Sequence, residues 1–366
     1  MSLFFRPSFH HFLSVRLLGT AAPRTLNGKH LESSSFQGGD ACPVALSFED
    51  PSAFRVKSFG ELLRALGVFR LCSVPILVNN CGKLMSFARS LLGKRGFSLI
   101  LRPTVYAQFV AGETEGEIAV AMEKMSSLGL RPMLAASVSK VRVLVDAEYT
   151  YMNPALSLVT MAMMKKFNQK GAWIWNTYQC YLKESRLLLL DAISQSVDQS
   201  FCLGVKLVRG AYMDKERKLA KQEGRPDPVH QSWEDTNDSY NGNLDIMLDL
   251  ISLHPQCYRI IVATHNEESV RHAVSRMGGL GIDKHAGSVC FGQLLGMCDH
   301  VSLTLAQQGY SVYKSVPYGS VDDTVPYLVR RAQENRTVLQ GIRKERDLLR
   351  QELRRRLREG LTGGRK

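Results

Sequence analysis

A short segment near the carboxyl end of the chain carries the side chains best suited to chemistry. Residues 327–335 are predicted to form one helix, and four polar or aromatic side chains at spacings of three and four share one side of it: Tyr327, Arg330, Arg331 and Glu334. Two adjacent guanidinium groups suit a planar carboxylate, which they hold through several charge-assisted hydrogen bonds. Glu334 could fix one of these groups. The same spacing also fits a solvated helix face with one weak ion pair.

The run before this helix favours the first interpretation. Residues 310–316 are rich in aromatic and β-branched side chains, as expected of a strand, and Pro317 and Gly319 close it with a turn. A strand whose carboxyl end leads into a helix with paired arginines is a common way for α/β folds to build an anion site. We therefore expect an anionic ligand here.

The elements that must position this site alternate between strand and helix. Apolar, β-rich runs occur at 141–147, 172–178, 201–208, 258–264, 288–294 and 311–316, and helical stretches occur at 154–167, 181–195, 235–253, 267–277 and 294–308. This order predicts parallel strands covered on both faces, in a TIM-like barrel or a doubly wound sheet. No GxGxxG motif follows the first strand, which argues against a Rossmann nucleotide site.

Polar side chains gather where these strands end. They are Asp146, Gln179, Lys206, Arg209, Thr264, His265, Asn266, Gln293, Lys314 and Ser315. Any one has a simpler explanation, since His265 could be a core histidine and Asp146 a helix cap. Together they predict a common site at one mouth of a barrel. Its cations would be Lys206, Arg209, His265, Arg330 and Arg331, which suit an anionic ligand. The acids are too few for a two-metal site, and the absence of an obvious nucleophile suggests that a cofactor carries the chemistry.

The rest of the chain sets the compartment and the boundaries. The two tails carry most of the net charge of +13: residues 1–31 hold +4 without an acid, and residues 336–366 hold +7. We expect a mitochondrial transit peptide at 1–31, with a disordered basic tail as the alternative, and no nucleic-acid partner. A linker at 32–57 and a helical region at 58–135 follow, the latter with a capping box at Thr114 and Glu117. The eight cysteines have no metal-ligand spacing, and no apolar run could span a membrane.

Four motifs occur in order along the second half of the chain. They are Val-Lys-Leu-Val-Arg-Gly-Ala-Tyr at 205–212, Ala-Thr-His-Asn at 263–266, Phe-Gly-Gln-Leu-Leu-Gly-Met-Cys-Asp at 291–299 and Tyr-Leu-Val-Arg-Arg-Ala-Gln-Glu-Asn at 327–335. Together they resemble the proline dehydrogenase family, most closely its hydroxyproline dehydrogenase branch. The resemblance implies a distorted (β/α)8 barrel over residues 136–341, FAD bound without a covalent link, and electron transfer to quinone in mitochondria.

The resemblance also assigns roles to residues. It implies that Arg330 and Arg331 hold the substrate carboxylate, that Tyr327, Tyr212 and Leu294 wall the pyrrolidine ring, and that Asp146 lies near the substrate. The residues expected to hold or frame FAD are Gln179, Lys206, Arg209, Gly210, Ala211, Thr264, His265, Asn266, Gln293 and Glu334. No side chain is expected to act as a catalytic acid, base or nucleophile, and no metal is expected.

Two departures from the family pattern matter. Proline-specific members carry Tyr where this chain has Ser315, which leaves room and a hydrogen-bonding hydroxyl for a substituent on proline C4. The second departure is a gap, because only about seven residues join the Arg-Pro-Met-Leu segment at 131–134 to the strand at 142–146. A barrel strand, with a lysine that the family places near the flavin, is predicted to be missing, which would leave unpaired strand edges.

The predicted reaction is oxidation of trans-4-hydroxy-L-proline to 1-pyrroline-3-hydroxy-5-carboxylate, with hydride transfer from ring C5 to FAD. The alternatives are an L-proline dehydrogenase and a shortened, inactive isoform. A last feature is the basic helix expected at 342–366, which carries a leucine stripe among many arginines. It could dock on the barrel as a structural brace, or lie on an anionic inner-membrane surface on the matrix side.

Overall fold

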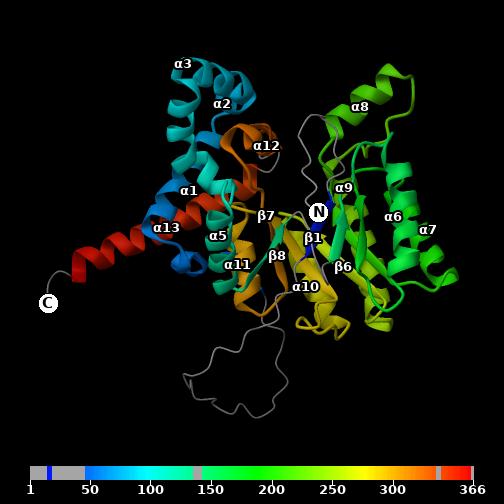
Figure 1. Ribbon diagram of the computed structural model, residues 1–366. Helices are drawn as coiled ribbons and strands as arrows, with labels where there is room; N and C mark the ends of the chain where they lie inside the picture. The colour runs from blue at the N-terminus through cyan, green and yellow to red at the C-terminus, as the bar shows by residue number, and fades with distance from the viewer. Residues whose placement is uncertain (1–14, 19–45, 135–141, 335–338, 364–366) are drawn as a thin grey trace, which may run out of the picture. The chain divides into compact units, whose positions relative to one another are not determined.

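The computed structural model describes residues 15–18, 46–134, 142–334 and 339–363 (Figure 1). Its strands are β1 (Val15–Leu18), β2 (Leu130–Leu134), β3 (Arg142–Val145), β4 (Ile174–Gln179), β5 (Leu203–Val208), β6 (Tyr258–Ala263), β7 (Val289–Leu294) and β8 (Val312–Ser315). Its helices up to the second strand are η1 (Pro51–Val56), α1 (Phe59–Cys72), α2 (Pro75–Asn79), α3 (Cys81–Leu101), η2 (Arg102–Tyr106), α4 (Ala107–Phe109) and α5 (Glu115–Ser127). The later helices are α6 (Asn153–Phe167), α7 (Ser185–Asp198), α8 (Met213–Gln222), α9 (Trp233–Leu253), α10 (Glu267–Gly279), α11 (Asp299–Gln307), α12 (Val321–Glu334) and α13 (Leu339–Gly363).

The predicted alternation of strand and helix is confirmed from β3 to α12. The capping box of α5 is also confirmed. The Thr114 side chain accepts a hydrogen bond from the main-chain N–H of Glu117, and the Glu117 side chain accepts one from the main-chain N–H of Thr114. Several elements were not predicted, including β1 within the predicted transit peptide and η1 within the predicted linker. β2 lies inside the predicted helical region, where Arg131 and Pro132 interrupt any apolar alternation. α8 is so polar that it gives no apolar periodicity to follow.

The sheet has the barrel topology that was predicted, with one strand replaced. The order of the described strands around the closed sheet is β1-β2-β8-β7-β6-β5-β4-β3, and β3 to β7 pair in parallel in chain order. β1 runs antiparallel to both of its neighbours, with Leu17 opposite Leu134 of β2 and Val15 opposite Val145 of β3. Seven residues between β2 and β3 are too few for the helical crossover that adjacent parallel strands need. The position of the missing barrel strand is therefore held by residues from the predicted transit peptide.

The chain divides into two compact units, which we describe separately. Unit 1 comprises residues 1–18, 133–264 and 286–292, and unit 2 comprises residues 19–132, 265–285 and 293–366. The boundary passes through β2 and β7, so it cuts across the predicted 136–341 barrel. Residues 32–57 were predicted to be a linker. Within that range η1 belongs to unit 2, and its Phe54 is fully buried.

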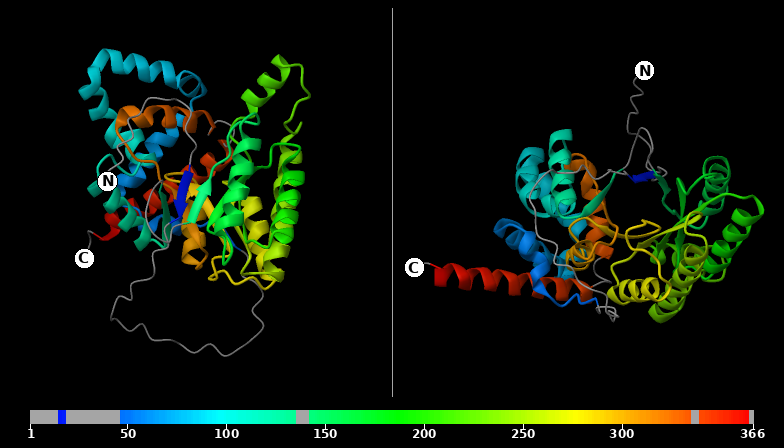
Figure 2. Two further views of the ribbon diagram at one scale, coloured as in Figure 1. Left: turned by 45° about the vertical axis from the view of Figure 1, so that its right-hand side comes forward. Right: turned by 90° about the horizontal axis from the view of Figure 1, so that it is seen from below.

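Unit 1 is a layer of parallel strands covered by helices. β4 is buried along its whole length, and α6, α7 and α9 pack against β4, β5 and β6. Figure 2 shows these helices on the outer side of the strands. Burial on both faces explains why the strand sequences are almost continuously apolar. The strand ends then become the natural place for the polar side chains.

Unit 2 is held by a buried group of charged side chains. Asp299, at the start of α11, accepts from Lys57 at 2.7 Å and from Lys314 of β8 at 2.8 Å. Glu345 of α13 is also buried, and its carboxylate accepts from the main-chain N–H groups of Cys298 and Asp299, at 2.9 Å each. This group ties η1, α11, β8 and α13 together. Breaking one member would leave an uncompensated charge in the interior.

Among the described residues, no helix combines the length and the apolar character needed to cross a membrane. The seven cysteines in the described ranges are free thiols.

Candidate active site

The predicted residues at the strand ends of unit 1 include a closely held ion pair. The Nζ of Lys206, on β5, lies 2.6 Å from Oδ1 of Asp146, which follows β3. Their side chains are only 11% and 13% exposed. The family resemblance implied separate roles for these two residues, Lys206 beside the cofactor and Asp146 beside the substrate. The structure brings them together, because β3 and β5 both flank β4 in the sheet.

Arg209, directly after β5, is fixed on three sides within the same unit. Its guanidinium group lies 4.4 Å from the centroid of the Tyr240 ring and donates to Oδ1 of Asn237 at 2.6 Å and to the Thr264 hydroxyl. Arg209 and Thr264 were both predicted as cofactor residues. Asn237 and Tyr240 were not, and they lie on α9 among residues that gave no signal beyond helical periodicity.

The backbone after Arg209 needs a glycine. Gly210 has φ of 133°, and a Cβ built on it would lie 1.4 Å from Cδ1 of the buried Tyr181. The main chain here runs against an aromatic ring, so no side chain fits. Gly210 therefore sets the path of Ala211 and Tyr212, which lead into α8.

Tyr212 is tied to the loop that follows β3. Its hydroxyl lies 3.2 Å from Oε2 of Glu148, and its ring centroid is 4.3 Å from that of Tyr149. The main-chain oxygen of Glu148 in turn accepts from Gln179 at 2.8 Å. The loop that carries Asp146 is thus connected to predicted residues on two other strand ends.

A buried carboxylate on α8 anchors this loop. Glu216 of α8 is 1% exposed, and it accepts from the Thr150 amide at 2.8 Å and from the Thr150 hydroxyl at 2.5 Å. Glu148, Tyr149, Thr150 and Glu216 were missed from the sequence. The run of polar residues after the strand could have indicated Glu148, but nothing in the letters pairs Thr150 with Glu216.

In unit 2 the predicted pair after β6 has local partners. Nε2 of His265 accepts from the main-chain N–H of Leu294 at 3.2 Å, which requires a lone pair on that nitrogen. The Asn266 side chain caps α10 by accepting from the Ser269 amide at 3.1 Å. His265 and Leu294 are therefore neighbours.

Gln293 and Lys314 are buried in unit 2 and engaged with the protein. Oε1 of Gln293 accepts from the Ser302 hydroxyl at 2.9 Å. Lys314 is 1% exposed, and besides pairing with Asp299 it donates to the main-chain oxygen of Met297 at 2.7 Å. Lys314 was predicted as one of the polar side chains at the strand ends, and this geometry makes it part of the buried charged group.

Residues 327–334, which carry the paired arginines, lie in a helix, as predicted. α12 follows a turn whose Pro317 and Gly319 bond to the main chain of Ala111 and Gly112. Leu328 is buried and packs the helix on its unit, Tyr327 is half-buried and Arg330 is exposed. Arg331 and Glu334 belong to the helix, but their side chains lie outside the described residues, as does all of Asn335. Ser315, the last residue of β8, is half-buried.

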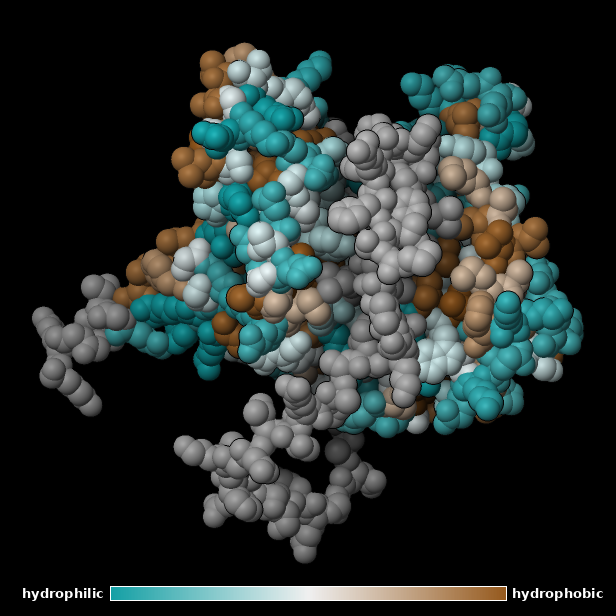
Figure 3. Space-filling view, in the orientation of Figure 1, coloured by the Kyte–Doolittle hydropathy of each residue, from teal (hydrophilic) through white to brown (hydrophobic). Residues whose placement is uncertain are grey.

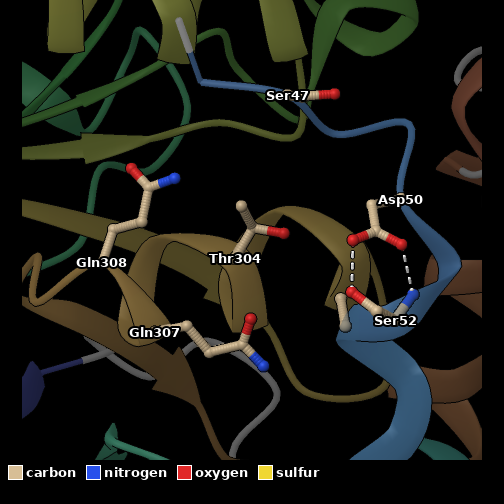
Figure 4. A pocket seen from close by; sticks show the side chains of 7 residues that line it. Ser47, Asp50, Ser52, Thr304, Gln307 and Gln308 are labelled. Atoms are coloured by element: carbon tan, nitrogen blue, oxygen red, sulfur yellow. Dashed lines mark hydrogen bonds between the residues drawn. The ribbon is translucent and has the colours of Figure 1, made fainter. Parts of the chain in front are cut away.

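A surface pocket in unit 2 contains none of the predicted residues (Figure 4). It is lined by Ser47, Asp50, Ser52, Ala53, Thr304, Gln307 and Gln308. The Asp50 carboxylate caps η1 by accepting a hydrogen bond from the main-chain N–H of Ser52. The pocket therefore offers no cationic group to an anionic ligand.

Comparison with known proteins decides the family. The model of the proline dehydrogenase family matches residues 97–344. The chain belongs to the proline dehydrogenase family. Hydroxyproline dehydrogenase of Xenopus laevis is 47% identical over 422 residues, which cover 86% of this chain and 91% of that protein. Proline dehydrogenase 1, mitochondrial, of Drosophila melanogaster is 49% identical over 232 residues, which cover 62% of this chain and 34% of that protein.

A solved structure agrees on the fold of this proline dehydrogenase family member. Proline utilization A from Bdellovibrio bacteriovorus, inactivated by N-propargylglycine, superposes with a TM-score of 0.58 at 17% identity, over 78% of this chain and 38% of that one. At this identity the likeness supports the fold alone. The Xenopus alignment also bears on the missing strand. It is 422 residues long whereas the whole chain has 366, so the relative carries internal residues that this chain lacks.

Proposed function

We propose that this dehydrogenase oxidises trans-4-hydroxy-L-proline to 1-pyrroline-3-hydroxy-5-carboxylate with FAD as its cofactor. The observation that carries the proposal is the near full-length match to hydroxyproline dehydrogenases, of which the chain covers 91% or more in Xenopus, cattle and human. Ser315 supports the same choice of substrate. Its short hydroxyl side chain at the end of β8 offers a hydrogen-bond partner to a C4 hydroxyl.

The polar residues of unit 1 fit an anionic cofactor rich in hydrogen-bonding groups. Gln179, Lys206, Arg209 and Thr264 bring amide, ammonium, guanidinium and hydroxyl donors to the carboxyl ends of consecutive parallel strands. The backbone at Gly210 lies open to solvent on the side away from Tyr181, so a flat group could approach it closely. These residues would hold FAD, which when bound accepts the hydride from the substrate ring.

The remaining roles belong to substrate binding and orientation. In this proposal Arg330 and Arg331 bind the carboxylate, and Tyr212, Tyr327 and Leu294 line the ring. Asp146, paired with Lys206, lies near the substrate. Since the neutral secondary amine is the better hydride donor, the rate should rise with pH. The cationic side chains then serve orientation rather than proton transfer.

The electron acceptor and the compartment are finer parts of the proposal. We propose a quinone acceptor and a mitochondrial location on the matrix side of the inner membrane. Relatives in Drosophila and human are named proline dehydrogenase 1, mitochondrial, which supports the compartment. For α13 the packing supports a structural brace, because Leu348 and Leu349 are buried. A membrane contact by α13 would have to use its exposed outer end, near Leu357.

Substrate preference and cofactor loading test the proposal together. Purified full-length chain should be yellow, with a flavin absorption band, and its kcat/KM should be higher for trans-4-hydroxy-L-proline than for L-proline. Ser315→Tyr should shift the preference toward L-proline, while Ser315→Ala tests loss of the hydroxyl without added bulk. A parent enzyme that clearly prefers L-proline would overturn the choice of substrate.

A second candidate is a shortened product without flavin or activity. The observation that favours it is the internal gap, which removes a barrel strand and the lysine that the family resemblance places near the flavin. A colourless protein that is monomeric and melts cooperatively would support this alternative. A colourless protein that aggregates would instead indicate that the gap prevents folding.

A further inference from the structure

One stretch of unit 2 contains basic residues but no acidic ones. Residues 62–112 contain no Asp or Glu, although a stretch of this length would hold about five at the average acid content of the chain. The same residues include seven Lys and Arg: Arg64, Arg70, Lys83, Arg89, Lys94, Arg95 and Arg102. This stretch forms α1, α2, α3, η2 and α4. Its basic character lies outside both charged tails and outside every residue assigned to the active site.

The same stretch exposes large apolar side chains on two neighbouring helices. Ile76 of α2 is 73% exposed, and on α3 the exposed fractions of Phe87, Leu91 and Leu99 are 67%, 71% and 77%. Leu84, Phe87 and Leu91 follow at spacings of three and four, so they form one stripe along α3. We call the set of Ile76, Leu84, Phe87 and Leu91 the α2–α3 surface. Figure 3 shows brown side chains gathered over this end of unit 2.

The other side of α3 is occupied by the protein itself. Cys81 and Phe97 are buried, and α3 packs on α12 and η2. The exposed stripe is therefore not the core-facing side of the helix. A soluble helix normally turns a polar face to water, and clustered exposed apolar side chains mark an interaction surface.

Cationic side chains border the stripe. Lys83 lies one turn before Phe87, and Arg95 follows the break in α3 at Gly93. Both are exposed, and no ion pair within the described ranges holds either of them. Arg89 and Lys94 share Asp322 of α12, at 3.1 and 3.3 Å, and their side chains remain 48% and 77% exposed. The surface thus combines apolar side chains with long basic ones whose charged ends can reach away from them.

We propose that the α2–α3 surface lies on an anionic membrane, with Phe87 and Leu91 in the boundary between headgroups and acyl chains. A membrane surface offers negative charge and an apolar layer at once, which is the combination that these residues complement. A second copy of the chain fits less well, because two such surfaces would bring like charges together, and residues 62–112 supply no acid to pair with Lys83 and Arg95. The helices would lie in the interface, since none of those described can cross a membrane.

Vesicle binding by the full-length chain tests the proposal. Vesicles of phosphatidylcholine with cardiolipin should bind the protein in low salt and release it in high salt, whereas vesicles of phosphatidylcholine alone should bind it weakly. Phe87→Ser/Leu91→Ser should raise the apparent Kd about tenfold or more by removing the inserted side chains. Lys83→Gln/Arg95→Gln should raise it several-fold and reduce its dependence on salt.

Two matched variants serve as controls. Leu187→Ser/Leu188→Ser removes two leucines of α7 that are 68% and 51% exposed in a stretch that does contain acids, and it should bind vesicles like the parent. Arg354→Gln/Arg358→Gln tests α13 in the same assay and should have a smaller effect than the α3 variants. Melting temperatures close to that of the parent would show that all of these surface variants fold.

Several outcomes would overturn the proposal. Unchanged vesicle binding by both α3 variants would do so, as would an equal loss in the α7 control. Binding that depends on α13 alone would assign the contact to that helix. A parent chain that dimerises through Phe87 and ignores vesicles would make this a protein interface. None of these measurements needs turnover, so failure of the proposed reaction would leave the result readable.

Discussion

The Lys206 ammonium lies 2.6 Å from the Asp146 carboxylate, and both side chains are almost buried at the carboxyl ends of β5 and β3. We expect Lys206→Met to destabilise the fold by about 3–5 kcal/mol, because it leaves a buried carboxylate without its partner. The double variant Asp146→Asn/Lys206→Met should lie closer to the parent than this single variant. Denaturant unfolding followed by circular dichroism measures both.

The exposed pair of Arg225 and Glu223 provides the control for this ion pair. Both side chains are nearly half exposed, so Arg225→Gln should cost only about 0–1 kcal/mol. A Lys206→Met variant no less stable than Arg225→Gln would contradict the idea that burial makes the Asp146–Lys206 pair important.

These residues show which parts of the site could be predicted from the sequence and which could not. Asp146, Gln179, Lys206 and Thr264 could be placed at strand ends because each ends an apolar run, and parallel strands bring such ends to one edge. The pairing of Asp146 with Lys206 could not, since it depends on the order of strands in the sheet. Thr150 and Glu216 were missed for the same reason. β1 was hidden because four residues in a basic, acid-free segment carry no strand signal of their own.

A second prediction concerns Glu216, which anchors the loop after β3. Glu216 is 1% exposed and accepts two hydrogen bonds from Thr150, four residues after Asp146. Glu216→Ala should free the loop that carries Asp146 and Glu148, and so disturb Tyr212. We expect KM for hydroxyproline to rise about tenfold or more, with a smaller fall in kcat, since in the proposed function the loop orients substrate and moves no proton.

The conservative variant separates positioning from general destabilisation at this anchor. Glu216→Gln keeps an acceptor oxygen for Thr150 and should retain most of the affinity for substrate, and the exposed neighbour Lys218→Ala should leave both constants unchanged. If Glu216→Ala lowers the melting temperature but leaves KM intact, the residue is a structural anchor only.

Acid should weaken unit 2 through Glu267. Burial raises the pKa of Glu267, but hydrogen bonds from His300 and Lys344 outweigh it and hold the pKa at about 2, below the ordinary 4.5. The folded state therefore favours the ionised form, so this contribution to stability is complete above pH 4.5 and is lost as the pH falls from 4.5 to 2. Melting temperature followed across this range should fall in the parent.

Replacing Glu267 shows whether it causes that fall. Glu267→Gln should be less stable than the parent at pH 7, and the difference between the two should shrink toward pH 2. The exposed residue Glu359 provides the control, and Glu359→Gln should follow the parent throughout. A constant difference between parent and Glu267→Gln at every pH would mean that ionisation of Glu267 does not contribute.

The last prediction concerns β1, which closes the sheet where a barrel strand is missing. β1 pairs with Met133 and Leu134 of β2 on one side and with β3 on the other, and all of these paired residues belong to unit 1. Deleting residues 1–31, as removal of a transit peptide would, should leave two strand edges with unpaired N–H and C=O groups, which are templates for association between chains. We expect this variant to melt at a lower temperature and to form oligomers in light scattering, and we expect deletion of residues 1–14, which stops before β1, to behave like the full chain. A 1–31 deletion that stays monomeric and melts like the parent would show that β1 is dispensable and that the edges are closed in another way.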